Sequence, residues 1–111
     1  MDIGFKSRRL QQTFIKPNGL VKSFGARMAK VISARMSLLE DVQNLSLVSY
    51  NPPERMHQLV GDRSEQFAIN LVHPFRLIFE VNHDPVPRKN DGGIDLANVT
   101  RITIIEVTDY H

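Results

Sequence analysis

Three side chains that can accept, donate or orient protons stand together at the end of the sequence: Asp109, Tyr110 and His111. They follow residues 101–108, whose β-branched side chains and partial alternation predict a strand. A strand paired to its neighbours holds its end rigidly, and acid–base chemistry requires rigid placement. Because strand side chains alternate, Asp109 and His111 would project from one face and Tyr110 from the other, whereas a bend would bring all three together. The triplet is therefore the first candidate catalytic group.

A second set of polar residues interrupts the apolar pattern of the strands expected upstream. His57 falls in a strand expected at 55–60, and Arg63 lies in the turn that follows it. In the strand expected at 75–81, alternation separates the apolar side chains from Arg76, so Arg76 should lie on the face of the sheet that the helices leave open. A guanidinium stays charged and binds phosphate oxygens in pairs, which favours Arg76 and Arg63 over the lysines for stabilising a phosphate transition state.

The basic residues are concentrated near the start of the sequence. Residues 1–35 hold eight Lys or Arg against one Asp, whereas residues 36–111 hold six against eleven acidic residues, which together give the net charge of +2. Such a segment suits a polyanion such as nucleic acid, because its cations neutralise phosphates and release counterions. Lys22, Arg27 and Lys30 are the candidate RNA-binding residues. The charge pattern favours equally a helix surface that only faces solvent.

The periodicity of apolar residues predicts one α+β domain over residues 1–111, with helices on a mainly antiparallel sheet. The chain is broken at 17–19 and at 51–53, where Gly and Pro end helices. The expected elements are a strand at 1–5, helical turns at 9–14, a helix at 23–39, its continuation or a short third helix at 38–47, strands at 55–60, 66–71, 75–81 and 101–110, and a long polar loop at 82–100. Consecutive strands near the end of the chain predict an antiparallel meander.

Composition narrows the class of protein. The sequence has no cysteine, which excludes disulfides and thiolate metal sites. Its four histidines lack the spacings typical of metal ligands, so we expect no metal and no cofactor. The first residues lack the apolar stretch of a secretion signal, and no apolar run approaches the length of a membrane span. We therefore expect a cytoplasmic protein without a membrane partner.

Four segments in a fixed order resemble a known family. They are His-Gln-Leu-Val-Gly-Asp-Arg at 57–63, Gln-Phe-Ala-Ile at 66–69, Phe-Arg-Leu-Ile-Phe-Glu at 75–80 and Asp-Tyr-His at 109–111. Together with the basic helical front end, they resemble the HigB branch of the RelE/ParE toxin superfamily over nearly the whole chain. The resemblance implies a RelE-like β-α-α-β-β-β fold, with two or three N-terminal helices packed on a four- to five-stranded sheet. It also implies a toxin that cleaves messenger RNA in the ribosomal A site without a metal and forms a toxin–antitoxin hetero-oligomer with a HigA-like helix-turn-helix antitoxin.

The resemblance assigns the active site to His57, Arg76 and the triplet at 109–111. Metal-free RNA cleavage needs a base for the 2′-hydroxyl proton, an acid for the departing 5′-oxygen, and cations for the phosphorane charge. Histidine exchanges protons near neutral pH, so two histidines could share the base and acid roles, and their order stays open. Val60 departs from the family, in which many members carry lysine there, and Arg63 or Arg55 could replace that phosphate contact.

Two other functions remain open for such a chain. On the same scaffold the ParE branch inhibits DNA gyrase by binding, without catalysis. The acid–base set favours the ribonuclease, because a gyrase binder has no need of it. The departure at Val60 leaves room for an inactive relative that only binds its antitoxin.

Overall fold

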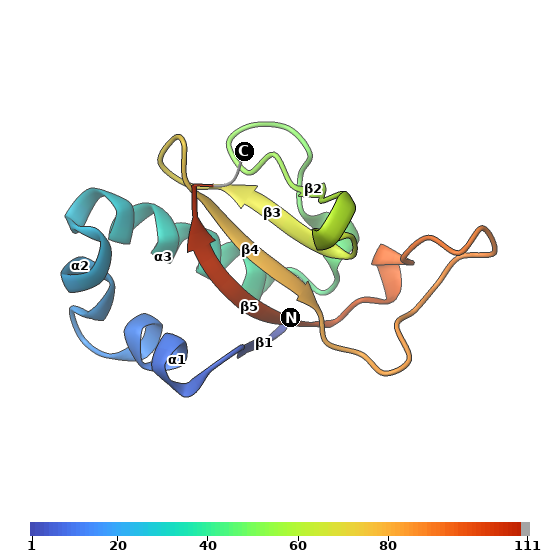
Figure 1. Ribbon diagram of the computed structural model, residues 1–111, viewed down its shortest axis with the longest axis horizontal. Coiled ribbons are helices and arrows are strands. Elements are labelled where there is room, and N and C mark those ends of the chain that lie inside the picture. Colours follow the sequence, from blue (N-terminus) through green and yellow to red (C-terminus); the bar gives the residue numbers. More distant parts are fainter. Residues whose placement is uncertain (110–111) are drawn as a thin grey trace.

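The computed structural model describes residues 1–109 and shows a twisted five-stranded sheet with helices on one face (Figure 1). The strands are β1 (Asp2–Phe5), β2 (His57–Gln58), β3 (Gln66–Asn70), β4 (Arg76–Val81) and β5 (Arg101–Thr108). The helices are α1 (Arg8–Ile15), α2 (Gly19–Phe24) and α3 (Ala26–Asp41), with short 3-10 helices at Leu45–Leu47, Gly61–Arg63 and Leu96–Asn98. This architecture confirms the expected α+β class.

The sheet has the order β1-β5-β4-β3-β2. The four strands β2 to β5 pair antiparallel as the expected meander. The first strand pairs parallel to the last, with Ile3 opposite Ile102, so the start of the chain closes one edge of the sheet. The three helices connect β1 at this edge to β2 at the opposite edge, and the meander then brings β5 back beside β1.

The core lies between α3 and the helix-covered face of the sheet. Met28, Ile32 and Leu39 project from one side of α3 and are buried, as expected for apolar residues at helical spacing. They pack in one cluster with buried side chains of the sheet, among which Phe67 and Phe79 are cross-strand partners with stacked rings 5.7 Å apart. This layer fixes the sheet that carries the candidate site.

The helix expected at 23–39 is α3, which begins only at Ala26 because the chain turns at Gly25. Gly25 has φ +83° and ψ 163°, and its N–H donates to the carbonyl of Val21 to end α2. Only glycine adopts this backbone conformation without strain. The apolar spacing continues across the break, so periodicity could not show it. The short third helix expected at 38–47 is the 3-10 turn at Leu45–Leu47, which the side chain of Asn44 caps.

The hairpin of α1 and α2 is held closely beside β1. Ser7 caps α1 by accepting a hydrogen bond from the N–H of Leu10 at 3.1 Å. At Gly19 the two helices approach so closely that a Cβ atom would lie 2.3 Å from the carbonyl oxygen of Thr13. Phe14 packs on Phe5 of β1, with ring centroids 5.3 Å apart. The hairpin is therefore fixed at the β1 edge of the sheet.

The structure differs from the prediction at the expected strand 55–60 and at the expected loop 82–100. Only His57–Gln58 forms a strand, because the chain turns at 61–63 and folds over the open face. Within the expected polar loop, Ile94 and Val99 are buried in the core. Arg88 also forms an ion pair with Glu65 at 2.7 Å, so the loop is tied to the turn before β3.

Candidate active site

The strand register places His57 and Arg76 on the same, open face of the sheet. Residues directly opposite each other in antiparallel strands share a face. One row across the open face is formed by His57, Ala68, Ile78 and Glu106, and the next by Asn70, Arg76 and Thr108. The intervening Leu77 belongs to the core on the other face, as alternation predicts. His57 and Arg76 are therefore two strands and one row apart, roughly 12 Å between Cα atoms from standard sheet spacings.

His57 is exposed, and one of its ring nitrogens is held by the backbone. Its Nδ1 atom lies 3.0 Å from the carbonyl oxygen of Arg55. A carbonyl oxygen only accepts hydrogen bonds, so this contact requires the proton on Nδ1 and leaves the lone pair of a neutral ring on Nε2. The geometry therefore presents Nε2 as a possible proton acceptor.

Arg76 is half-buried and stands opposite the last residue of β5. Its register partner is Thr108, and Asp109 follows directly as an exposed residue. The end of β5 thus reaches the row of Arg76, and the structure brings Asp109 into the neighbourhood that the sequence predicted. Tyr110 and His111, the other two residues of the predicted triplet, lie outside the described residues.

Arg63 is held across the open face by an acidic residue that sequence reasoning missed. Its Nη2 donates to Oε2 of Glu106 at 2.7 Å, and its Nη1 donates to the side-chain oxygen of Gln66 at 3.0 Å. Both charged side chains keep about a third of their surface exposed, at 30% and 38%. Strict alternation from the buried Ile102 and Ile104 would turn Glu106 toward the core, and only the irregularity in the β4–β5 register places it opposite Ile78 on the open side, so the sequence pattern could not have indicated it. A carboxylate so placed can orient a cation or exchange a proton at the site.

A small apolar cluster lies beneath this ion pair. Leu59, Ala68, Ile78 and Ile105 are buried there on the open side of the sheet. Leu59, just before the turn at 61–63, belongs to this cluster, and Arg63 of the turn reaches Glu106, so the turn is anchored on the open face. The candidate site is the part of the face beside it, next to His57 and Arg76.

Two solved structures share this architecture, whereas no protein-family model and no curated protein matches the sequence. The YoeB/ParE toxin from Agrobacterium tumefaciens superposes with a TM-score of 0.60 at 11% identity, over 100% of both chains. The YoeB-YefM complex from Staphylococcus aureus gives a TM-score of 0.57 at 13% identity, over 100% of this chain and 97% of that one. This chain has the YoeB/ParE toxin fold. At these identities the likeness shows the fold, and the expected RelE/ParE superfamily and its HigB branch stay predictions.

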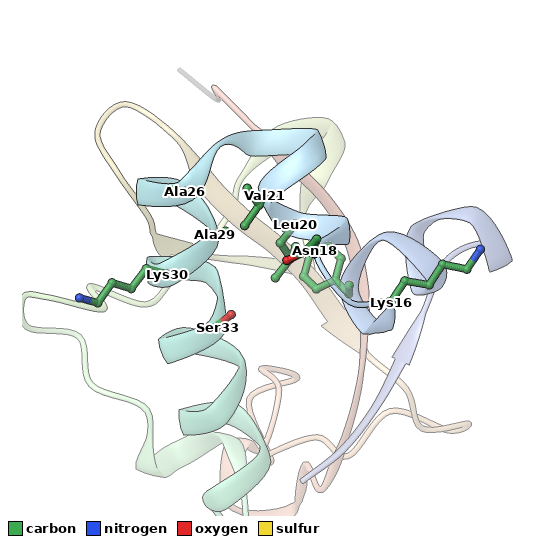
Figure 2. Close-up of a pocket in the computed structure, with 9 residues that line it drawn as sticks. Lys16, Asn18, Leu20, Val21, Ala26, Ala29, Lys30 and Ser33 are labelled. Carbon is green, nitrogen blue, oxygen red and sulfur yellow. The ribbon is translucent and has the colours of Figure 1, made fainter.

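The predicted RNA-binding residues occupy different parts of this YoeB/ParE fold. Lys22 lines a shallow pocket between α1 and α2 together with Arg9 and Lys16. Lys30 borders another pocket, on the α3 side of the hairpin (Figure 2). Figure 2 shows Lys30 extending from α3 away from Lys16. Arg27 is exposed on α3 and lines neither pocket. The structure thus separates Lys22 from the other two.

Val60 begins the turn at 61–63 in this YoeB/ParE fold, with 78% of its surface exposed. An apolar residue there supplies no phosphate contact. Of the two arginines that could replace it, Arg63 forms the ion pair with Glu106, and Arg55 is exposed beside His57. Their roles as substitutes stay predictions.

His73 and His83 do not join this site. The Nε2 atom of His83 accepts hydrogen bonds from the N–H groups of Thr100 and Arg101, at 3.0 and 3.3 Å, and thereby anchors the start of β5. His73 is exposed in the β3–β4 turn. Within residues 1–109 no group of three or more potential metal ligands is gathered. No helix in that range combines the length and apolarity needed to cross a membrane.

Proposed function

We propose that this chain is the toxin of a toxin–antitoxin pair and that it cleaves messenger RNA on the ribosome. The supporting observation is the open face of a YoeB/ParE fold, on which His57 and Arg76 stand in adjoining rows. A base and a guanidinium at this separation can act on opposite sides of one phosphodiester. The resemblance of segments 57–63, 75–80 and 109–111 to the HigB branch supports the same activity.

In this proposal Nε2 of His57 takes the proton of the ribose 2′-hydroxyl. The 2′-oxygen then attacks phosphorus, the bond to the 5′-oxygen breaks, and the products are a 2′,3′-cyclic phosphate and a 5′-hydroxyl. Arg76 bears the charge of the phosphorane, because its fork of N–H groups matches the equatorial oxygens. The triplet at 109–111 supplies the acid for the 5′-oxygen. The roles can also be reversed, with His111 as the base and His57 as the acid. One proton is then still taken from the 2′-hydroxyl and one is given to the 5′-oxygen.

The proposed partners are an antitoxin and the ribosome with its messenger RNA. One of the similar solved structures is a complex, the YoeB-YefM complex. By analogy, we propose that an antitoxin binds this chain in a hetero-oligomer, and the HigB resemblance makes a helix-turn-helix protein of the HigA type the candidate. A toxin that acts on translating ribosomes would work in the cytoplasm.

The decisive experiment is to map transcript ends after brief expression of the chain without an antitoxin. We expect new 5′ ends inside translated regions, placed in frame with codons. The variant His57→Gln should abolish these ends, whereas the matched variant His73→Gln in the β3–β4 turn should leave them. Growth arrest with altered DNA supercoiling and no new ends would contradict the proposal and favour a gyrase-binding toxin. Neither arrest nor new ends would indicate an inactive relative.

A further inference from the structure

Two shallow pockets adjoin on the α1–α2 hairpin, and one of them reaches Ile105 of β5. The first, of about 290 Å³, is lined by Lys6 and Arg9 among others, and the second, of about 250 Å³, by Arg9, Lys16 and Lys22. Arg9 lines both pockets, so they form one continuous surface. We refer to its four cations, Lys6, Arg9, Lys16 and Lys22, as the hairpin basic surface.

The charge of this surface is not neutralised within residues 1–109. All four cations are exposed, none of them forms an ion pair with a residue in that range, and no carboxylate lines either pocket. Four like charges on two short helices repel one another, and a bound polyanion would remove that repulsion. The lining also contains hydroxyl groups, from Ser7 and Ser23, of the kind that hydrogen-bond phosphate oxygens.

One end of the surface reaches the apolar cluster on the open face of the sheet. Ile105 lines the first pocket together with Lys6, and it also belongs to the apolar cluster under the open face with Ala68 and Ile78. The N–H of Lys6 donates to the carbonyl of Ile104 at 2.9 Å, so the backbone at this end of the surface is fixed to β5. A chain that crosses the open face toward β5 would therefore continue onto the hairpin.

We propose that the hairpin basic surface binds the phosphate backbone of RNA that extends beyond the candidate site. The inference rests on the proposed function, because it names where that site holds its nucleic acid. It differs from the sequence prediction, since Lys6, Arg9 and Lys16 join Lys22, while Arg27 and Lys30 on α3 lie outside this surface.

RNA fits this surface better than an acidic protein segment does. Protein interfaces depend on apolar or aromatic anchors in a well-packed centre. Apart from Pro17 and Gly19, the second pocket is lined by cations, hydroxyl groups and an amide, whereas Leu10, Phe24 and Ile105 also line the first. Phe5, Phe14 and Met36 line a separate pocket of the hairpin. Four exposed cations with no carboxylate among the lining residues are typical of contacts to a sugar–phosphate chain.

The test measures binding of the full chain to a single-stranded 2′-O-methyl RNA, which cannot be cleaved, at several salt concentrations. The test variant is the double substitution Arg9→Gln/Lys22→Gln. The control variant is Arg101→Gln/Lys89→Gln, which removes one arginine and one lysine far from the hairpin and so changes the net charge equally. Circular dichroism and thermal melting check that both variants fold like the original chain.

We expect the test variant to bind several-fold more weakly. The slope of its log affinity against log salt concentration should fall by roughly 0.7 for each phosphate that the variant no longer neutralises. The control should bind like the original chain. Equal losses of affinity in both variants would show an effect of net charge alone and would overturn the proposal. Unchanged binding in the test variant would overturn it as well, and would leave an acidic protein segment as the remaining occupant.

Failure of this inference is distinguishable from failure of the proposed function. If transcripts are cut but Arg9→Gln/Lys22→Gln binds normally, only the inference fails. If Arg9→Gln/Lys22→Gln loses RNA binding but the original chain cuts no transcripts in cells, the proposed RNA surface stands and the ribonuclease proposal fails.

Discussion

Arg63 and Glu106 are 43 residues apart in the chain, yet their side chains meet across the open face at 2.7 Å. This ion pair holds the turn at 61–63 over β5 and so sets one boundary of the candidate site. Because both side chains are about a third exposed, solvent weakens their attraction. The ion pair therefore positions the turn at 61–63 more than it stabilises the fold.

Single and double substitutions measure how much the ion pair of Arg63 with Glu106 contributes to the free energy of unfolding. We expect Glu106→Gln and Arg63→Met each to lower the free energy of unfolding by about 1 kcal/mol or less, with a coupling energy of roughly 0.2–1 kcal/mol in the double-mutant cycle. Urea unfolding at neutral pH measures all three variants, and Glu40→Gln on α3 controls for the removal of an exposed carboxylate. A coupling energy of zero would mean that the two side chains do not meet in solution.

The ion pair between Arg88 and Glu65 predicts a dependence of stability on pH. The hydrogen bond from Arg88, reinforced by its charge, holds the pKa of Glu65 below the ordinary value. A carboxyl with a lowered pKa stabilises the fold above its unfolded pKa, and this contribution is lost as the pH falls through the folded pKa. The original chain should therefore be more stable than Arg88→Gln at pH 7, and the difference should disappear in acid once Glu65 is protonated.

Lys89→Gln is the control for that experiment, because the neighbouring Lys89 is 3.9 Å from Asp91 and makes only a loose ion pair. Its stability should follow that of the original chain at every pH. A gap between the original chain and Arg88→Gln that persists unchanged at acidic pH would show that Glu65 is not the titrating partner.

Gly25 should be the glycine least tolerant of a side chain for backbone reasons. At φ +83° and ψ 163°, alanine would be strained, and we expect Gly25→Ala to cost about 1–3 kcal/mol although open space surrounds the site. Gly4→Ala in β1 is the matched change, because its Cβ would meet neighbours only at 3.9 Å or more and at ordinary backbone angles. Thermal unfolding compares the stability of Gly25→Ala with that of Gly4→Ala. Equal stability of both variants would exclude strain at Gly25.

Removal of the His57 ring should affect chemistry without affecting folding. If His57 acts as an acid or base, His57→Gln should slow RNA cleavage by roughly 10²–10⁴-fold. The ring is exposed, so the melting temperature should change little. Cleavage of a messenger RNA in a ribosome-dependent assay gives the rate, and His73→Gln controls for removal of an exposed imidazole. A rate within a few-fold of the original would remove His57 from the mechanism.

Changes in the triplet at 109–111 test its part in the same reaction. We expect Asp109→Asn and His111→Gln each to let cells tolerate expression without an antitoxin, because the first removes the group that orients a proton and the second removes a candidate acid. Plating efficiency after induction gives the readout, and immunoblotting confirms that the variants accumulate. Full toxicity of both variants would exclude the triplet from catalysis.

The sequence by itself determined the types of element and the sidedness of several strands. Alternation at 75–81 was enough to assign Arg76 to the open face, since Leu77, Phe79 and Val81 had to face the core between sheet and helices. The helical spacing of Met28, Ile32 and Leu39 likewise indicated the buried side of α3. These features depend on local periodicity, which the order of residues records directly.

Only the tertiary structure decided which distant residues meet. The parallel pairing of β1 with β5, the ion pair of Arg63 with Glu106, and the burial of Ile94 in an expected polar loop all join segments far apart in the chain. The turn at Gly25 separated Lys22 from Lys30, although one continuous helical pattern had placed them together. Periodicity is a property of neighbours in sequence, whereas a binding surface depends on strand register and helix packing, which are set by contacts across the whole chain.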